Sequence, residues 1–330
     1  MLNQMLKKKV EEKIFYEHQK DVDSEDFVFK SHEWTEFFDE HHAVQLDGVS
    51  FGVYVGGKLS PDRLTFVLLH GCGFSSLSWG LVTSKLKNLA PVVCLDFRGH
   101  GSSFVSSSLS SALDLSLPRL CEDVERVLST FFTQLCSFSA VPPLFMVGHS
   151  MGGAVAAHVV SRGSVAKSVK ALCVVDVVEG TALASIPHML SWVKTFPASF
   201  DALPSAVHFF VDCGLIRSFA AACISVPPLF YLSSVDQRYH WKVDIASTDR
   251  FWKDWYVSLS ATFLSTPVSV RLLMLAGTDR LDKELTIAQM QGKFQLLLLS
   301  HSGHCIQEDQ PEQMVSYLST AFHRVTQFVK

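Results

Sequence analysis

Short apolar runs alternate with longer amphipathic stretches along most of this sequence. A continuous apolar run that is too short for a helix is typical of a strand buried on both faces of a sheet. The predicted strands are residues 64–69, 92–95, 144–147, 171–175, 270–275 and 294–299, and the predicted helices are residues 77–89, 117–135, 152–160, 283–290 and 313–328. This alternation predicts a mostly parallel sheet with helices on both faces.

Two further features complete the predicted domain. Residues 44–46 and 49–55 flank an Asp-Gly pair, which predicts a β-hairpin ahead of the parallel strands. The alternation then breaks at about residues 180–265, a stretch that contains aromatic residues and prolines. Because ligands bind beyond the carboxyl ends of parallel strands, we expect this stretch to be a helical lid insertion there. We predict one domain over residues 31–330, preceded by a polar, flexible leader at residues 1–30.

Composition and charge narrow the class of protein. Apolar residues make up 48% and charged residues 18% of the 330 positions, with a net charge of −4, which is the balance of a globular protein without a nucleic-acid-binding surface. The eight cysteines form no Cys-x-x-Cys pair and no metal-ligand spacing with histidine, so no metal site is predicted. The charged N-terminus lacks an apolar signal-peptide stretch. We therefore expect an intracellular protein of the cytoplasm, with the nucleus as a second compartment.

One uncharged stretch, residues 218–235, approaches the length of a membrane span. It contains Pro227-Pro228 and four serines, which favour a buried or lid segment over a spanning helix. A soluble protein without a membrane partner is predicted.

The strongest chemical signal is Gly148-His149-Ser150-Met151-Gly152, which follows a predicted strand and opens a helix of small residues. This strand–turn–helix context makes Gly-x-Ser-x-Gly a nucleophile elbow, the catalytic turn of serine hydrolases with the α/β-hydrolase fold. We predict that Ser150 is the nucleophile. The Met151 N–H, at the start of the helix, is expected to stabilise the oxyanion.

A second loop, His70-Gly71-Cys72-Gly73, ends the first long buried strand. In this fold that loop donates the other oxyanion N–H. We assign it to Cys72, with Gly73 as the fallback.

A serine hydroxyl needs a general base, and the order of the triad along this fold is Ser, acid, His. After the last predicted strand the candidates are His301 and His304, and the motif Ser302-Gly303-His304 favours His304. The acid has two candidates, Asp176 and Asp279, each at the carboxyl end of a predicted strand. Either one could orient His304, and the later position is the commoner one in this fold.

Longer runs of sequence resemble one family. Protein phosphatase methylesterases have segments similar to residues 174–182 and to residues 275–295, which include Met-Gln-Gly-Lys-Phe-Gln. Phe251-Trp252-x-x-Trp255 and Trp34-x-x-Phe37-Phe38 also match, so the resemblance covers about residues 30–325. It implies removal of the methyl ester from the C-terminal leucine of the protein phosphatase 2A catalytic subunit, without a cofactor.

The resemblance also implies site residues and a partner. The family's triad acid falls on Asp176, which leaves Asp279 a structural role, and the partner is the methylated tail of the phosphatase 2A catalytic subunit. The sequence departs from the family in the loop after His70, where the family has a further Gly and a His. It departs again at about residues 185–240, where an apolar segment replaces the acidic insertion of some members.

Two other functions remain open on the residues alone. A serine hydrolase of another small-molecule or lipid ester would use the same triad, because fold and triad do not set the substrate. A phosphatase-binding regulator with secondary catalysis is the alternative from another class.

Overall fold

The structure, a computed structural model, describes residues 28–106, 113–277 and 281–328. Most of the predicted leader and the alternative acid Asp279 therefore lie outside the described residues.

The main sheet has the strand order β1-β2-β4-β3-β6-β7-β11-β12, with β5 paired to β2. All pairs from β4 to β12 are parallel, whereas β2 pairs antiparallel with β1, β4 and β5, so the prediction of a mostly parallel sheet is confirmed. The strands are β1 (Glu40–Leu46), β2 (Val49–Gly56), β3 (Thr65–Leu69), β4 (Val92–Leu95), β5 (Phe104–Val105), β6 (Leu144–His149), β7 (Val169–Val175), β11 (Val270–Leu275) and β12 (Gln295–Leu298).

The predicted hairpin is present as β1 and β2, which pair antiparallel in register from Glu40↔Val55 to Leu46↔Val49. Asp47 and Gly48 both have positive φ, at 48° and 75°. A two-residue loop with positive φ at both positions matches the right-handed twist of the flanking strands.

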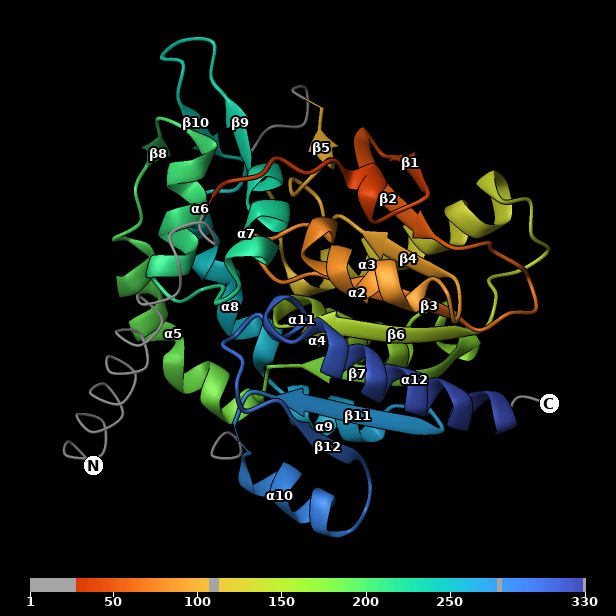
Figure 1. Cartoon of the computed structure of the whole chain (residues 1–330). Helices are drawn as coiled ribbons and strands as arrows, with labels where there is room; N and C mark the ends of the chain where they lie inside the picture. The colour runs from red at the N-terminus through yellow and green to blue at the C-terminus, as the bar shows by residue number, and fades with distance from the viewer. Residues whose placement is uncertain (1–27, 107–112, 278–280, 329–330) are drawn as a thin grey trace.

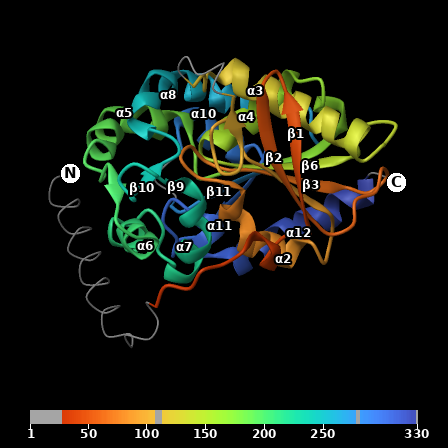
Figure 2. The same ribbon diagram turned by 90° about the horizontal axis from the view of Figure 1, so that it is seen from above.

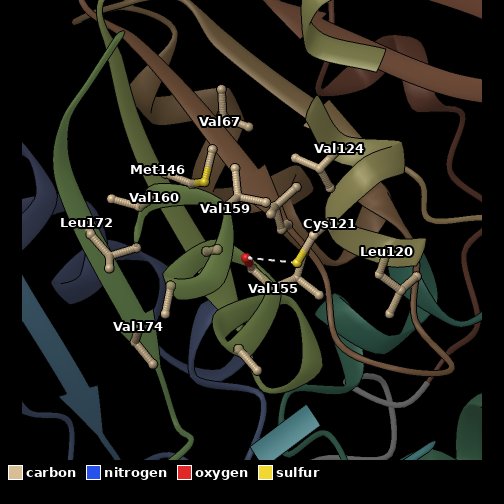
Figure 3. Packing of buried hydrophobic residues seen from close by; sticks show 14 of the residues in the cluster. Val67, Leu120, Cys121, Val124, Met146, Val155, Val159, Val160, Leu172 and Val174 are labelled. Atoms are coloured by element: carbon tan, nitrogen blue, oxygen red, sulfur yellow. Dashed lines mark hydrogen bonds between the residues drawn. The ribbon is translucent and has the colours of Figure 1, made fainter. Parts of the chain in front are cut away.

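Helices cover both faces of this sheet, and each face has its own buried core. Along β3, Phe66 and Leu68 contribute to the core beneath α2 (Gly80–Leu86) and α12 (Pro311–Phe328). Val67 and Leu69 point the other way, toward α3 (Leu117–Thr130) and α4 (Met151–Arg162). Figure 3 shows this second core, where side chains of β6, β7 and α4 interdigitate with those of α3. Successive strand residues face opposite sides of a sheet, so a continuous apolar run fills two cores at once.

The segment between β7 and β11 is mostly helical and also contains a small separate sheet. Its helices are α5 (Glu179–Val193), α6 (Leu203–Asp212), α7 (Phe219–Ser225), α8 (Asp249–Tyr256) and α9 (Leu259–Ser265). Its strands β8 (Ser199–Phe200), β10 (Tyr239–Trp241) and β9 (Phe230–Leu232) pair antiparallel in that order. The sequence analysis did not predict this sheet, because its strands are too short to give a pattern.

The position of this segment matters for the site. The arrowheads of β6 and β11 point toward α5, α7 and α8 in Figure 1, and Figure 2 shows α5, α6 and α7 on the same side of the molecule. The carboxyl ends of the parallel strands therefore face this segment. Within the described residues, no helix is both long enough and apolar enough to cross a membrane.

Candidate active site

Ser150 lies in a strained turn between β6 and α4, with φ 52° and ψ −120°. Its backbone N–H donates to the Val175 carbonyl at 2.9 Å, which ties the turn to the end of β7. A Cβ at Gly148 would lie 2.1 Å from the backbone oxygen of Gly152, and one at Gly152 would lie 2.5 Å from that of His70. Only glycine fits where strand and helix approach so closely, and this explains the spacing of the motif.

His304 and Asp176 meet at the carboxyl ends of the strands. His304 Nδ1 lies 2.8 Å from Asp176 Oδ2, although the two residues are 128 positions apart. The Asp176 side chain is fully buried, and its Oδ1 accepts from the Ala276 N–H at 3.0 Å. An ionised carboxylate at Nδ1 holds the imidazole in the tautomer whose Nε2 can accept a proton. The structure therefore places Asp176, one of the two predicted acids, against His304.

The loop that carries His304 is held at several points. The Gly303 N–H donates to Asp309 Oδ2 at 2.7 Å, and the His304 carbonyl accepts from His149 Nε2 at 2.9 Å. The other candidate base, His301, is exposed and does not line the cavity described below.

Asp309 connects this loop to the segment between β7 and β11. Its Oδ1 accepts from the backbone N–H groups of Arg217 at 2.8 Å and of Ser218 at 3.3 Å, just before α7. Asp309 was not among the predicted site residues, although its position five residues after His304 in an acidic pair was a usable signal.

Cys72 and Met151 each present a backbone N–H with no hydrogen-bond partner among the described residues. The Gly73 N–H donates to His100 Nε2 at 3.0 Å, so it is not free to bind an oxyanion. The two residues that the sequence analysis preferred are therefore the ones with available donors. Burial raises the pKa of the Cys72 thiol to about 12, so this side chain is not a competing nucleophile at neutral pH.

Three buried histidines, His70, His100 and His149, hold the loops around Ser150. Desolvation is the main cause that lowers their pKa values, to about 4 for His70 and about 3 for His100 and for His149. They are neutral, and each has a nitrogen facing a carbonyl oxygen. The other nitrogen of His70 accepts from the Phe97 N–H at 3.0 Å, as that of His100 does from Gly73. His70 and His100 thus fix the loop at residues 70–73, and His149 ties the turn at Ser150 to the loop that carries His304.

Comparisons with known proteins bear on this arrangement. A family model described as "Alpha/beta hydrolase family" matches residues 66–316. "Probable protein phosphatase methylesterase 1" of Caenorhabditis elegans is 38% identical over 298 residues, covering 89% of this chain and 78% of the relative. "Protein phosphatase methylesterase 1" of Bos taurus is 34% identical (87% and 84% covered), and that of Schizosaccharomyces pombe is 35% identical (88% and 85% covered).

The chain belongs to the protein phosphatase methylesterase family. The resemblance found in the sequence is thereby confirmed. The predicted α/β-hydrolase fold and the prediction that the protein is a hydrolase are confirmed with it. Solved structures agree on the fold alone. "E-2-(Acetamidomethylene)succinate Hydrolase" has a TM-score of 0.67 at 15% identity (85% of this chain and 98% of that chain), and the "Thioesterase Domain From Curacin Biosynthetic Pathway" has 0.61 at 20% identity (84% and 98%).

In this methylesterase-family chain, a cavity of about 470 Å³ opens beside Ser150, His304 and Asp176. Its walls come from the oxyanion loop, from one side of α5 and from α8. Among the described residues that line it, none is a lysine, arginine or glutamate. The lining includes the hydroxyl-bearing and apolar residues Thr181, Ser185, Met189, Trp192, Phe196 and Phe210.

Tyr256, the last residue of α8, was missed by the sequence analysis. Burial raises the pKa of its hydroxyl, and a hydrogen bond with Ser150 opposes that shift. The residue lines the same cavity. Its position directly after the Phe-Trp-x-x-Trp motif was the only signal in the sequence.

Proposed function

We propose that this protein is a serine carboxylesterase that removes the methyl ester from the C-terminal leucine of the protein phosphatase 2A catalytic subunit. The observation that carries the proposal is the placement of His304 against Asp176 beside Ser150, in a chain of the methylesterase family.

The chemistry follows from these groups. Ser150 Oγ attacks the ester carbonyl carbon while His304 Nε2 takes its proton. The Cys72 and Met151 N–H groups stabilise the oxyanion, and His304 then protonates the departing methanol. Water, deprotonated by the same histidine, attacks the acyl-enzyme and releases the free carboxylate tail. Each step uses protein groups and water.

We further propose that residues of about 180–265 act as a lid that contacts the phosphatase. Exposed apolar side chains on and next to β9 support this role, since Tyr231 is 51%, Leu232 53% and Val235 95% exposed. Aromatic side chains of this kind anchor protein interfaces.

A location in the cytoplasm or nucleus is supported by the eight cysteines, all of which are free thiols.

The test of the nucleophile is Ser150→Ala, which should abolish both methanol release from methylated phosphatase 2A and labelling by a fluorophosphonate probe. Labelling that persists in this variant would exclude Ser150. If Ser150→Ala still binds the phosphatase, binding and catalysis are separate properties of one site.

The test of the acid compares Asp176→Asn with Asp279→Asn on one activated ester. Loss of a triad carboxylate lowers kcat by about 10⁴-fold in serine proteases, because the histidine adopts the wrong tautomer. We expect a loss of that order for Asp176→Asn only. A larger loss for Asp279→Asn would reverse the assignment.

The test of the partner is kcat/KM for methanol release from the intact methylated phosphatase and from its free C-terminal peptide. Contacts outside the tail can be used to orient the ester over Ser150, so the intact phosphatase should be the better substrate. Equal values would mean that only the tail is recognised.

A further inference from the structure

The cavity beside Ser150 follows one face of α5. Thr181, Ser185, Met189 and Trp192 all line it, and their spacing of three or four residues places them on one side of the helix. Thr181 and Trp192 are eleven residues apart, which corresponds to about 16 Å at 1.5 Å per residue. The cavity is therefore an elongated channel that starts near the reacting groups.

The far part of this channel is apolar. Its described lining includes Met189 and Trp192 of α5, Phe196 just after that helix, and Phe210 of α6. Trp192 and Phe196 lie edge to face with their ring centroids 5.0 Å apart. None of the described residues that line this part is charged, so a charged group there would have no ion-pair partner.

Even the hydroxyl groups in the wall make their hydrogen bonds within α5. The Ser185 hydroxyl donates to the Ala182 carbonyl at 2.8 Å, and the Thr181 hydroxyl donates to the Val178 carbonyl at 3.3 Å. A ligand therefore needs no hydrogen-bonding groups along this wall. A flexible, unbranched hydrocarbon chain meets that description.

We propose that the protein also hydrolyses methyl esters of unbranched, uncharged carboxylic acids of medium chain length, with the acyl chain lying along α5. The proposal rests on the proposed function, which places a large acyl group in the cavity and releases methanol. Ser150 Oγ forms a bond to the ester carbonyl carbon and methanol leaves with the proton held by His304. Water then cleaves the acyl–Oγ bond and yields the free acid.

The experiment measures kcat/KM of the full-length protein for two isomeric esters, methyl octanoate and heptyl acetate. They have the same formula, but only the first has its long chain on the acyl side. We expect kcat/KM for methyl octanoate to be at least tenfold higher. From methyl butanoate to methyl octanoate, kcat/KM should rise by about two- to fourfold for each added methylene, because each buried methylene contributes a similar increment of binding free energy.

A substitution on α5 tests whether the acyl chain of the ester lies in this channel. Met189→Trp fills the middle of the channel, so in this variant kcat/KM for methyl octanoate should no longer exceed that for methyl butanoate. The matched control is Met290→Trp on α10 (Lys283–Met290), where the side chain is 82% exposed and outside the cavity.

The outcomes separate this inference from the proposed function. A flat chain-length series, or faster hydrolysis of heptyl acetate, overturns the acyl-channel inference even if the same preparation demethylates the phosphatase. Absence of fluorophosphonate labelling at Ser150 would overturn the proposed function instead. If Met189→Trp does not fold, the wild-type series and the isomer pair still decide.

Discussion

The three buried neutral histidines around the site predict a specific loss of stability in mild acid. His70, His100 and His149 have folded-state pKa values of about 4, 3 and 3, below the value of about 6.5 in an unfolded chain. As the pH falls below 6.5, the unfolded state binds protons that the folded state cannot bind. The stability contribution of these histidines is therefore fully present above pH 6.5 and is lost as the pH falls from 6.5 to about 3.

Buried carboxyl groups act in the opposite direction, since burial raises the pKa values of Asp123, Asp309 and Glu308. Glu308 is buried beside α7, where its Oε2 accepts a hydrogen bond from the Ser225 hydroxyl, and desolvation raises its pKa well above the usual range. The folded state keeps this proton at a pH where the unfolded chain has lost it. Lowering the pH therefore stabilises the folded state through Glu308.

The size of the effect follows from these shifts. Between pH 7.0 and 5.5 each buried histidine costs about 1.2 kcal/mol, which gives about 3.7 kcal/mol for the three. Glu308 offsets part of this, so the net loss in the wild type is smaller than the loss that the three histidines cause by themselves. In Glu308→Gln this offset is absent, so the loss between pH 7.0 and 5.5 should be larger than in the wild type.

The assay is urea-induced unfolding at pH 7.0 and 5.5 for both proteins, with the free energy of unfolding extrapolated to water. Glu312→Gln is the matched control, because that side chain is 73% exposed and its loss should leave the pH dependence at the wild-type value. Wild-type stability that is unchanged at pH 5.5, or the same loss in Glu308→Gln as in the wild type, would refute the reasoning.

Four further predictions concern single residues. Gly148→Ala should destabilise the protein by about 3 kcal/mol and abolish fluorophosphonate labelling, because the new methyl group overlaps the backbone of the nucleophile helix. Asp309→Ala leaves three backbone N–H groups without their acceptor and should lower the free energy of unfolding by about 3 kcal/mol, together with kcat on a small activated ester. Glu312→Ala, which breaks only an exposed ion pair, should change stability by less than about 0.5 kcal/mol. Asp123→Ala leaves the Arg98 guanidinium buried without its carboxylate and should cost about 3–5 kcal/mol in urea unfolding while labelling of the folded fraction persists. For Asp309→Ala and Asp123→Ala, a decrease of less than about 1 kcal/mol in the free energy of unfolding would contradict the prediction.

The sequence alone determined the local features of this protein. Apolar runs located every parallel strand of the main sheet, because a strand buried on both faces needs no polar position. The Asp47-Gly48 turn and the nucleophile elbow were equally readable, since each depends on the backbone freedom of residues that are neighbours in the chain. Boundaries were less exact: the predicted helix at residues 77–89 begins as a 3₁₀ turn over Ser76–Trp79.

Only the tertiary structure decided which distant residues meet. Two aspartates at strand ends were equivalent by pattern, and the order of the strands brings Asp176 to His304. The bond from the Gly73 N–H to His100 removes one candidate oxyanion donor, and no local pattern reports it. The channel along α5 likewise depends on how that helix packs over the sheet ends. Hydrophobic periodicity records which side of an element is buried but not what it is buried against, so the chemistry of the site required the folded chain.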